Sequence, residues 1–325
     1  MNSKTKNRKS QSKSSEKIKI EFTDQKLTNY AGLVAMEPFM NDWLGMRSML
    51  NEDTLKLNRC PNFEYSSYDY ISMVLCGILT GGDRMNKVSF MSRDKVLSHT
   101  FGWKGTPHAG SLARYFKSFE SESIEALKTL IEKMRRKVWS RIRCQDVTID
   151  NDSTVNTVYG KQEGACKGYN PDHRGEHSYH PLLAFVDRTQ EVLNERLRPA
   201  NCYTGKGVNE FIEDCLSNLP AHIRGVTIRG DSGFFDDDLL DKIESYQSKS
   251  CTYLIKVKMR NLDRVLADQE WEQSIDPDIM TCDFEYRCGN WQRARRFNGV
   301  KVKTDKTDHL RMVFRRINEW TDQRL

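Results

Sequence analysis

The spacing of apolar residues changes its period near residue 147, and this change most constrains the fold. Between residues 24 and 145, apolar side chains recur at intervals of three and four residues, which is typical of amphipathic helices. From Val147 onward apolar and polar residues alternate, as in the run "VTID", which is typical of a half-buried strand. The chain is therefore expected to combine a mainly helical region with a region that contains a sheet.

The second region alternates between strand-like and helix-like runs. Three strand-like runs are followed by a helix, a strand, a helix and a strand, over residues 146–152, 180–187, 191–199, 205–220, 225–234, 235–247 and 251–258. Strands followed by alternating helices and strands form a mixed α/β sheet. We therefore expect an α/β fold with helices packed on a mixed sheet.

The helical region ends in a basic amphipathic segment. Apolar residues at helical spacing run through Leu112, Tyr115 and Phe119, and a longer helix is expected from about residue 123. A small helix, a tight turn and a second helix that carries Arg114 and Lys117 would have helix-turn-helix geometry, which binds DNA. A plain helical bundle explains the same pattern equally well.

The net charge of +6 comes from the amino terminus. Residues 1–19 hold seven Lys or Arg and one Glu, so the rest of the chain is neutral overall. The first 23 residues lack apolar periodicity and are expected to be a disordered tail, which either contacts nucleic acid or is simply solvated. Because the body is neutral, a nucleic-acid site there must be a local basic patch. The candidates are "RRKVWSRIR" at 135–143 and "RARRF" at 293–297, and each can also be a solvated face.

Two further features bear on the compartment. The nine cysteines include no C-x-x-C pair, which indicates a reducing environment rather than a disulfide framework. The longest apolar run, residues 71–79, is too short to cross a bilayer, and no apolar segment follows the basic amino terminus as in a secretory signal. The cytoplasm is the expected location, with no membrane partner.

Two predicted strands end in an acidic residue. Asp152 follows "TIDN" and Asp231 follows "VTIRG". The first and fourth strands of a mixed sheet can lie side by side, which brings both carboxylates to one edge, where they repel each other unless a cation lies between them. Mg²⁺ prefers such oxygen ligands and also accepts phosphate oxygens, as phosphodiester chemistry requires. The alternative for Asp152 is an ordinary turn, in which Asn, Asp and Ser bind their own backbone.

The neighbouring polar residues are separated from this pair. Asp150 points to the same side as Asp152 and is expected to be either a supporting residue or the true ligand, whereas Asn151 should face away. The acids at 236–238 are expected to cap a helix and interact with its dipole. His173, His177 and His180 have no cysteine cluster beside them, so loop histidines near phosphate are favoured over zinc ligands.

Several motifs, in the same order, resemble the DDE transposases of bacterial insertion sequences, specifically the insertion-sequence-1380 family. They are "IDNDST", "YGKQEGACKGYNPDHRGEHSYHPLLAFVDRT", "LRPANCYTG" and "IRGDSGF", with "GILTGGDRMNKVSFMSRDKVL" and "GTPHAGSLARYFKSF" upstream and "EYRCGNWQRARRF" downstream. The resemblance covers about residues 24 to 300. It implies a ribonuclease-H-like core that binds Mg²⁺ or Mn²⁺ and cuts and rejoins DNA. Asp152 and Asp231 would be the first and second catalytic carboxylates.

The resemblance also implies a domain plan and partners. Residues 1–23 would be the tail, 24–145 a helical DNA-binding or dimerisation region, 146–264 the catalytic core and 265–325 a β-rich insertion. The DNA partners would be the terminal inverted repeats and the target, bound by a homodimer at the nucleoid. Lys167 and Arg174 would contact phosphate, although plain surface charges are an equal alternative.

Such a core also needs a third acid, usually a Glu on a helix after the insertion. Glu319 lies four residues after Arg315, as the family motif requires, but Met312 occupies the expected tyrosine position and the surrounding residues alternate like a strand. The chain is therefore expected to lack its final catalytic helix, and to bind DNA with little or no cleavage. The alternatives are a ribonuclease-H-like nuclease or resolvase, and a non-catalytic DNA-binding remnant.

Overall fold

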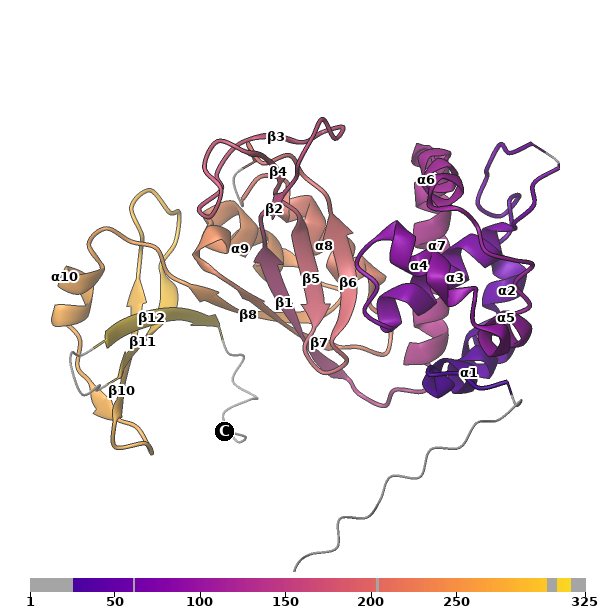
Figure 1. The fold of residues 1–325 in the computed structure, drawn as a ribbon. Coiled ribbons are helices and arrows are strands. Elements are labelled where there is room, and N and C mark those ends of the chain that lie inside the picture. The colour runs from indigo at the N-terminus through magenta and orange to yellow at the C-terminus, as the bar shows by residue number, and fades with distance from the viewer. Residues whose placement is uncertain (1–25, 61, 203–204, 303–308, 317–325) are drawn as a thin grey trace, which may run out of the picture. The chain divides into compact units, whose positions relative to one another are not determined.

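The computed structural model describes residues 26–60, 62–202, 205–302 and 309–316, the last of these as backbone (Figure 1). It contains two compact units, Met1–Met134 and Arg135–Leu325. The boundary lies inside a long helix, α7 (Ser121–Trp139), and so comes earlier in the chain than the expected boundary at residue 145.

The first unit is helical, as its apolar spacing predicts. Its elements are α1 (Ala31–Pro38), the π-helix η1 (Phe39–Trp43), α2 (Met46–Met49), α3 (Ser67–Leu79), α4 (Met85–Met91), α5 (Lys95–Phe101), α6 (Ala109–Lys117) and most of α7. A capping box at Ser66 and Asp69 begins α3, since each side chain accepts a hydrogen bond from the backbone N–H of the other residue. The inner face of α6 is anchored by Tyr115, which stacks on Tyr70 of α3 at 4.4 Å between ring centroids.

The helix-turn-helix expectation is wrong about which helix carries Arg114 and Lys117. Residues 102–108 separate α5 from α6, whereas a helix-turn-helix has a turn of about three or four residues. The tight turn lies after α6, at residues 118–120. Arg114 and Lys117 therefore lie on the helix before that turn, and both side chains are exposed.

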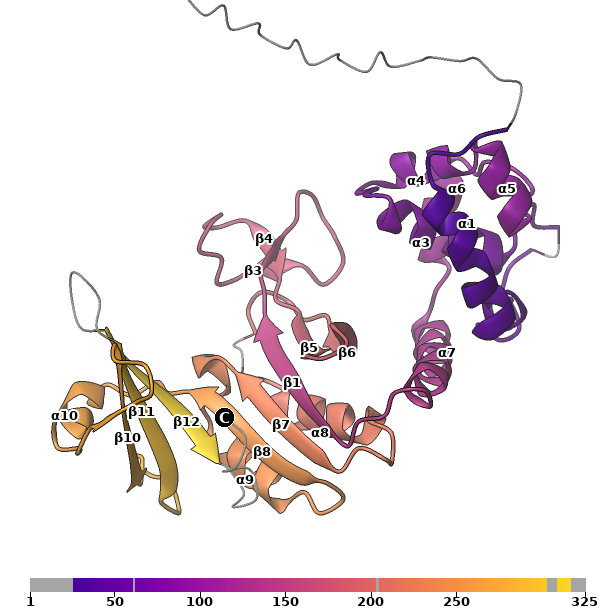
Figure 2. The ribbon, with the colours of Figure 1, turned by 90° about the horizontal axis from the view of Figure 1, so that it is seen from below.

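The second unit is built on one mixed sheet of nine strands (Figures 1 and 2). In spatial order the strands are β6 (Glu191–Arg196), β5 (Leu182–Val186), β1 (Asp146–Ser153), β7 (Gly225–Gly230), β8 (Ser250–Lys256), β12 (His309–Arg316), β11 (Arg295–Val302), β10 (Ile279–Tyr286) and β9 (Glu272–Gln273). Strands β1, β7 and β8 are parallel, and the other neighbours are antiparallel. The predicted mixed α/β sheet is confirmed. The segment that was expected to be β-rich, 265–317, extends this same sheet through the pairing of β12 with β8.

Two helices cover one face of the parallel strands. The buried residues of β1 and β7 alternate along each strand and pack against α8 (Val208–Asn218) and α9 (Asp237–Ser245), the two helices that the sequence predicts. This core includes Val147, Ile149, Val226, Ile228, Phe211, Cys215, Leu240 and Ile243. Each fully buried side chain of this size stabilises the fold by about 1.5–3 kcal/mol. The other residues of these strands face the opposite side, where they are only half-buried or exposed.

A second, three-stranded sheet was not predicted. It has the order β2-β4-β3, with β2 (Asn156–Thr157), β3 (Cys166–Lys167) and β4 (His177–Tyr179), and it lies beyond the carboxyl end of β1 in both ribbon views (Figures 1 and 2). Strands of two or three residues leave too short an alternation to be recognised in a sequence. The remaining short elements are the 3₁₀ turn η2 (Ser232–Phe234) and α10 (Leu262–Ala267).

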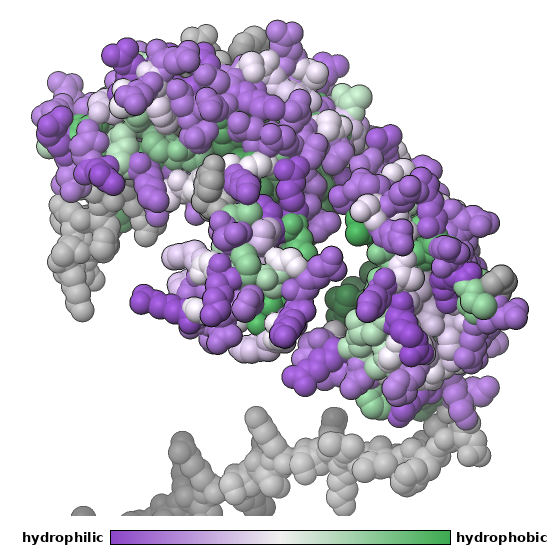
Figure 3. Space-filling view, turned by 90° about the horizontal axis from the view of Figure 1, so that it is seen from above, coloured by the Kyte–Doolittle hydropathy of each residue, from purple (hydrophilic) through white to green (hydrophobic). Residues whose placement is uncertain are grey.

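The exterior agrees with a chain that is 30% charged. The face drawn in Figure 3 is mostly hydrophilic, with hydrophobic residues visible in small patches. Among the residues that are described, no helix combines the length and the apolar character needed to cross a bilayer. All nine cysteines are free thiols.

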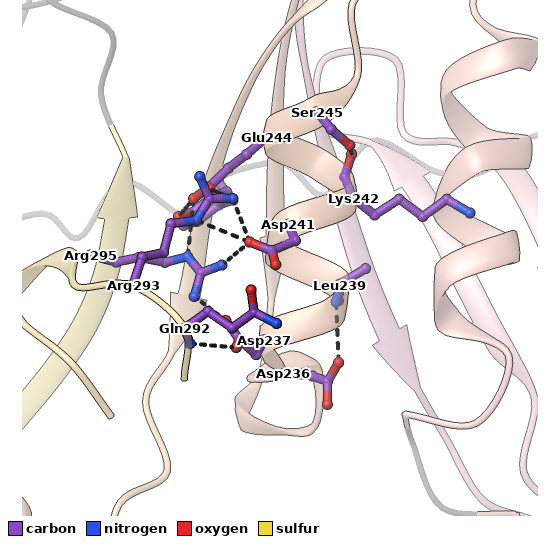
Figure 4. A network of polar contacts seen from close by, with 11 residues as sticks. Asp236, Asp237, Leu239, Asp241, Lys242, Glu244, Ser245, Gln292, Arg293 and Arg295 are labelled. Carbon is purple, nitrogen blue, oxygen red and sulfur yellow. Dashed lines mark hydrogen bonds and ion pairs between the residues drawn. The ribbon is translucent and has the colours of Figure 1, made fainter. Parts of the chain in front are cut away.

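An ionic network joins β11 to α9 (Figure 4). The Arg295 guanidinium, of which 3% is exposed, contacts Asp237 and Asp241 and lies 3.2 Å from Glu244. Arg293 contacts Asp241 and lies 2.7 Å from Glu244 Oε2, but its side chain is 53% exposed. Burial lowers the pKa of Arg295, and Asp237 and Glu244 more than offset this, so that its pKa is raised overall.

The network bears on two sequence-based expectations. In the basic run at 293–297, Arg293 and Arg295 are paired with α9, and Arg296 is paired with Asp283 at 2.6 Å. Asp236 caps α9 as expected, accepting from Leu239 N at 3.1 Å. Asp237, by contrast, serves as a partner of Arg295 rather than only as a charge at the helix terminus.

We expect Arg295→Met to lower the free energy of unfolding by about 3–5 kcal/mol, because it removes the buried cation that pairs with Asp237 and with the almost buried Glu244. Arg293→Met removes a cation from the same network at an exposed position, so it should cost less than about 1 kcal/mol. Urea unfolding of both variants measures the difference. Equal losses would show that burial does not govern this network.

Candidate metal centre

The face of the sheet opposite α8 and α9 carries three rows of residues across β1, β7 and β8. The first row is Thr148, Thr227 and Thr252, and the second is Asp150, Arg229 and Leu254. The last pairs in register join Asn151 to Gly230 and Gly230 to Ile255. The next position on each strand therefore forms a third row at the carboxyl edge, which consists of Asp152, Asp231 and Lys256.

Both acids of the third row are exposed and locally fixed. Asp152 Oδ1 accepts a hydrogen bond from the backbone of Ser153 at 2.8 Å, and Asp231 Oδ1 accepts one from Gly233 at 2.8 Å while it caps η2. In the described part of the chain, the second oxygen of each carboxylate has no hydrogen-bond partner. Asp152 lies within β1 and, among the described residues, its side chain bonds only the residue next to it, so it does not form the turn expected as the alternative. One oxygen of each acid is left available.

Asp150 is occupied by a different partner. It faces Arg229, its neighbour in register on β7, and accepts from Arg229 Nη2 at 2.6 Å. Arg229 also contacts Asp187 at 2.9 Å. The hydrogen bond that Arg229 donates to Asp150, followed by the charges of both acids, raises the pKa of Arg229. Asp150 is therefore committed to an ion pair, which favours the supporting role over that of the metal ligand.

Asn151 lies on the opposite side of β1, as the alternation predicts. It is 4% exposed, and its Nδ2 donates to the carbonyl of Arg229 on β7 at 3.1 Å. This bond ties the ends of β1 and β7 together beneath the acids. On the exposed side, a hollow of about 390 Å³ is lined by Asp150, Asn151, Asp152, Arg229, Gly230, Asp231, Leu254 and Lys256.

A buried histidine holds the residue that follows Asp152. His180 is 7% exposed, and its Nδ1 lies 2.8 Å from the carbonyl oxygen of Cys202. Since a carbonyl only accepts, Nδ1 carries the proton and Nε2 is left to accept from the Ser153 hydroxyl at 3.1 Å. The expectation that His180 is a loop histidine near phosphate is wrong in one respect, because the ring is buried and supports the end of β1.

The other residues that were predicted to belong to functional sites lie outside the third row. Lys167 is on β3 and Arg174 is in the loop between β3 and β4, and both are exposed. Arg114 and Lys117 belong to the first unit. Glu319 lies outside the described residues. The sequence-based predictions did not include Lys256, which lies in the row with the two acids. The alternation of "YLIK" nevertheless indicates that Lys256 ends a strand, as the two acids do.

The two carboxylates have the chemistry of a partial Mg²⁺ site. Mg²⁺ keeps several waters and is commonly held by one or two carboxylates together with substrate phosphate. Groups of three or more His, Cys, Asp or Glu side chains placed to hold a metal are absent from the residues that the structure describes. Asp152 and Asp231 therefore suit an ion that takes its remaining ligands from water and phosphate, rather than a closed structural site.

Known structures with similar coordinates are transposase complexes. One is the piggyBac transposase synaptic complex with hairpin DNA, similar over 89% of this chain and 62% of that chain, with 13% identity and a TM-score of 0.40. Another is the Mos1 transposase paired-end complex with the left transposon end, similar over 60% of each chain, with 9% identity and a TM-score of 0.25. The chain thus spans less than two thirds of either structure. No curated protein matches it.

A family model matches almost the whole chain. The model, described as transposase DDE domain group 1, covers residues 10–323 and so includes β1, β7 and both acids of the third row. The chain belongs to the family of DDE transposases.

Proposed function

We propose that this protein is a DNA transposase that binds the ends of its insertion sequence and catalyses metal-dependent strand cleavage and transfer, with Asp152 and Asp231 as its first two metal-binding carboxylates. The observation that carries the proposal is the register of β1 and β7, which puts both acids at one sheet edge. Membership of the DDE transposase family supports it. DDE transposases use divalent metal ions, and Mg²⁺ or Mn²⁺ is proposed here.

The residues around the acids have separate tasks in this proposal. A bound divalent ion polarises a phosphodiester and stabilises the oxygens that attack and leave. Asp152 and Asp231 each offer a free oxygen, while Asn151 holds their strands together. Arg229 neutralises Asp150, so that the charge left at the edge is that of the two ligands. His180 orders Ser153 and thereby the end of β1.

The finer assignments form part of the same proposal. We place the chain in the insertion-sequence-1380 group of bacteria, with a ribonuclease-H-like core and a homodimeric DNA complex in the cytoplasm at the nucleoid. The DNA partners are the terminal repeats and the target. Lys167 and Arg174 are proposed phosphate contacts, because both are exposed and lie in the segment that follows Asp152.

A single assay distinguishes two other functions from the proposed one. Purified chain is incubated with Mn²⁺ and DNA that carries the element's ends, and both cut and joined products are measured. Cutting without joining would favour a nuclease or resolvase. Binding without cutting would favour a non-catalytic DNA-binding protein.

The third acid can be tested in the same assay. If Glu319 is that acid, cutting should be abolished in Glu319→Ala as completely as in Asp152→Asn. If cutting persists in Glu319→Ala, the third carboxylate is another residue.

For the metal, we expect Asp152→Asn and Asp231→Asn each to weaken Mn²⁺ binding by at least about tenfold. A loss of about 1.4 kcal/mol of binding free energy is enough to lower the affinity tenfold. Calorimetric titration measures the affinity. Asp150→Asn is the matched control, because Asp150 is paired with Arg229, and it should change the affinity much less. An Asp150 variant that loses binding, beside unaffected Asp152 and Asp231 variants, would identify Asp150 as the true ligand.

For the first unit, the proposal is that its exposed cations bind DNA. The double variant Arg114→Gln/Lys117→Gln should bind a DNA duplex more weakly, and the dependence of affinity on salt should become shallower by about 0.9 for each lost phosphate contact. Lys128→Gln/Lys133→Gln on α7 removes the same charge as a control. If both double variants behave alike, α6 has no specific role.

A further inference from the structure

Lys256 occupies the third row beside the two acids. It is the last residue of β8, one position beyond the pair that joins Gly230 of β7 to Ile255 of β8. Its side chain is exposed and lines the hollow together with Asp152 and Asp231. The sheet therefore delivers a cation to the edge at which it delivers the two carboxylates.

The Lys256 ammonium has no role in an ion pair within the described part of the fold. Other cations of this unit have acidic partners, such as Arg229 with Asp187 at 2.9 Å and Lys242 with Glu213 at 2.6 Å. Lys256 makes no ion pair with any residue that the structure describes. It lies close to Asp231 in the row without neutralising it, so its charge remains available to a ligand.

The charges of the hollow indicate what that ligand is. Among the residues that line the hollow, the charge of Arg229 balances that of Asp150, and the two negative charges of Asp152 and Asp231 remain. One divalent ion balances these two, and Lys256 then adds a single positive charge. A phosphodiester carries one negative charge, and lysine binds phosphate oxygens as a point charge.

We infer that Lys256 binds a phosphodiester oxygen of the DNA strand in the hollow, next to the metal-binding carboxylates. The inference rests on the proposed function and adds a substrate-binding residue to it. Lys256 is a binding and positioning residue in this account, because it holds the phosphate beside the ion. Sequence-independent binding is expected, since a phosphate oxygen is common to all nucleotides.

The test measures the binding of a fluorescein-labelled DNA duplex to the full chain by anisotropy, with Mn²⁺, over a series of salt concentrations. We expect Lys256→Gln to bind the duplex about tenfold more weakly. The loss of one contact to a charged group has an effect of this size on affinity. Its plot of log affinity against log salt should be shallower by about 0.9. Lys256→Arg should retain most of the affinity, because it keeps the charge.

Lys258→Gln is the matched control. Lys258 is also exposed and lies two residues further along the chain, outside β8. Its loss should leave the affinity nearly unchanged. Equal weakening in both Gln variants would overturn the inference in favour of a general effect of charge.

A second readout separates phosphate binding from support of the acid pair. Without DNA, Lys256→Gln should bind Mn²⁺ as tightly as the parent chain or more tightly, because a like charge has been removed. Loss of Mn²⁺ binding would overturn the inference, since Lys256 would then maintain the carboxylates. If the parent chain binds DNA and Lys256→Gln binds it equally with the same salt dependence, only the Lys256 contact is wrong. If the parent chain does not bind DNA, the proposed function is wrong and this contact with it.

Discussion

The parallel pairing of β1 with β7 is the contact on which the candidate centre depends. Its register places Asn151 opposite Gly230, so the next residue on each strand is an acid at the same edge. A shift of one residue in either strand would turn its acid toward the side covered by α8 and α9. The Asn151 side chain adds a cross-strand hydrogen bond to Arg229 at this point, which opposes such a shift.

The two faces of the sheet have different roles, since one contributes to stability and the other carries the polar residues of the candidate centre. On one face, the alternating apolar residues of the parallel strands are buried against α8 and α9. On the other face, the same strands present threonines, the Asp150–Arg229 pair and the third row. Because successive side chains point to opposite sides, a substitution at Asp152 or Asp231 removes nothing from the apolar core. The carboxylates can therefore be changed as ligands without a direct cost to packing.

Arginines in the second unit mostly act as structural cations. Arg295 is nearly buried and joins β11 to α9, and Arg229 joins β7 to β1 and Asp187. A buried arginine needs acidic partners because desolvation of its charge is costly. The basic run at 293–297 is therefore paired with acids, as Arg293, Arg295 and Arg296 show. Lys256 is one of the lysines that have no acidic partner among the described residues, and it lies at the sheet edge.

The sequence by itself determined that the first unit is helical, and it determined the order β1, β5, β6, α8, β7, α9 and β8 in the second unit. It did so because the period of the apolar residues reports which side of each element is buried. It also identified Asp152 and Asp231 as strand-end acids and Asn151 as facing away. The tertiary structure decided which cations are neutralised, since the partners of Arg229, Arg293 and Arg295 lie on other elements. It likewise decided that Asp150 is paired, that His180 is buried, and that Lys256 shares a row with the acids. These facts depend on contacts between segments far apart in the chain, and periodicity along one segment carries no information about them.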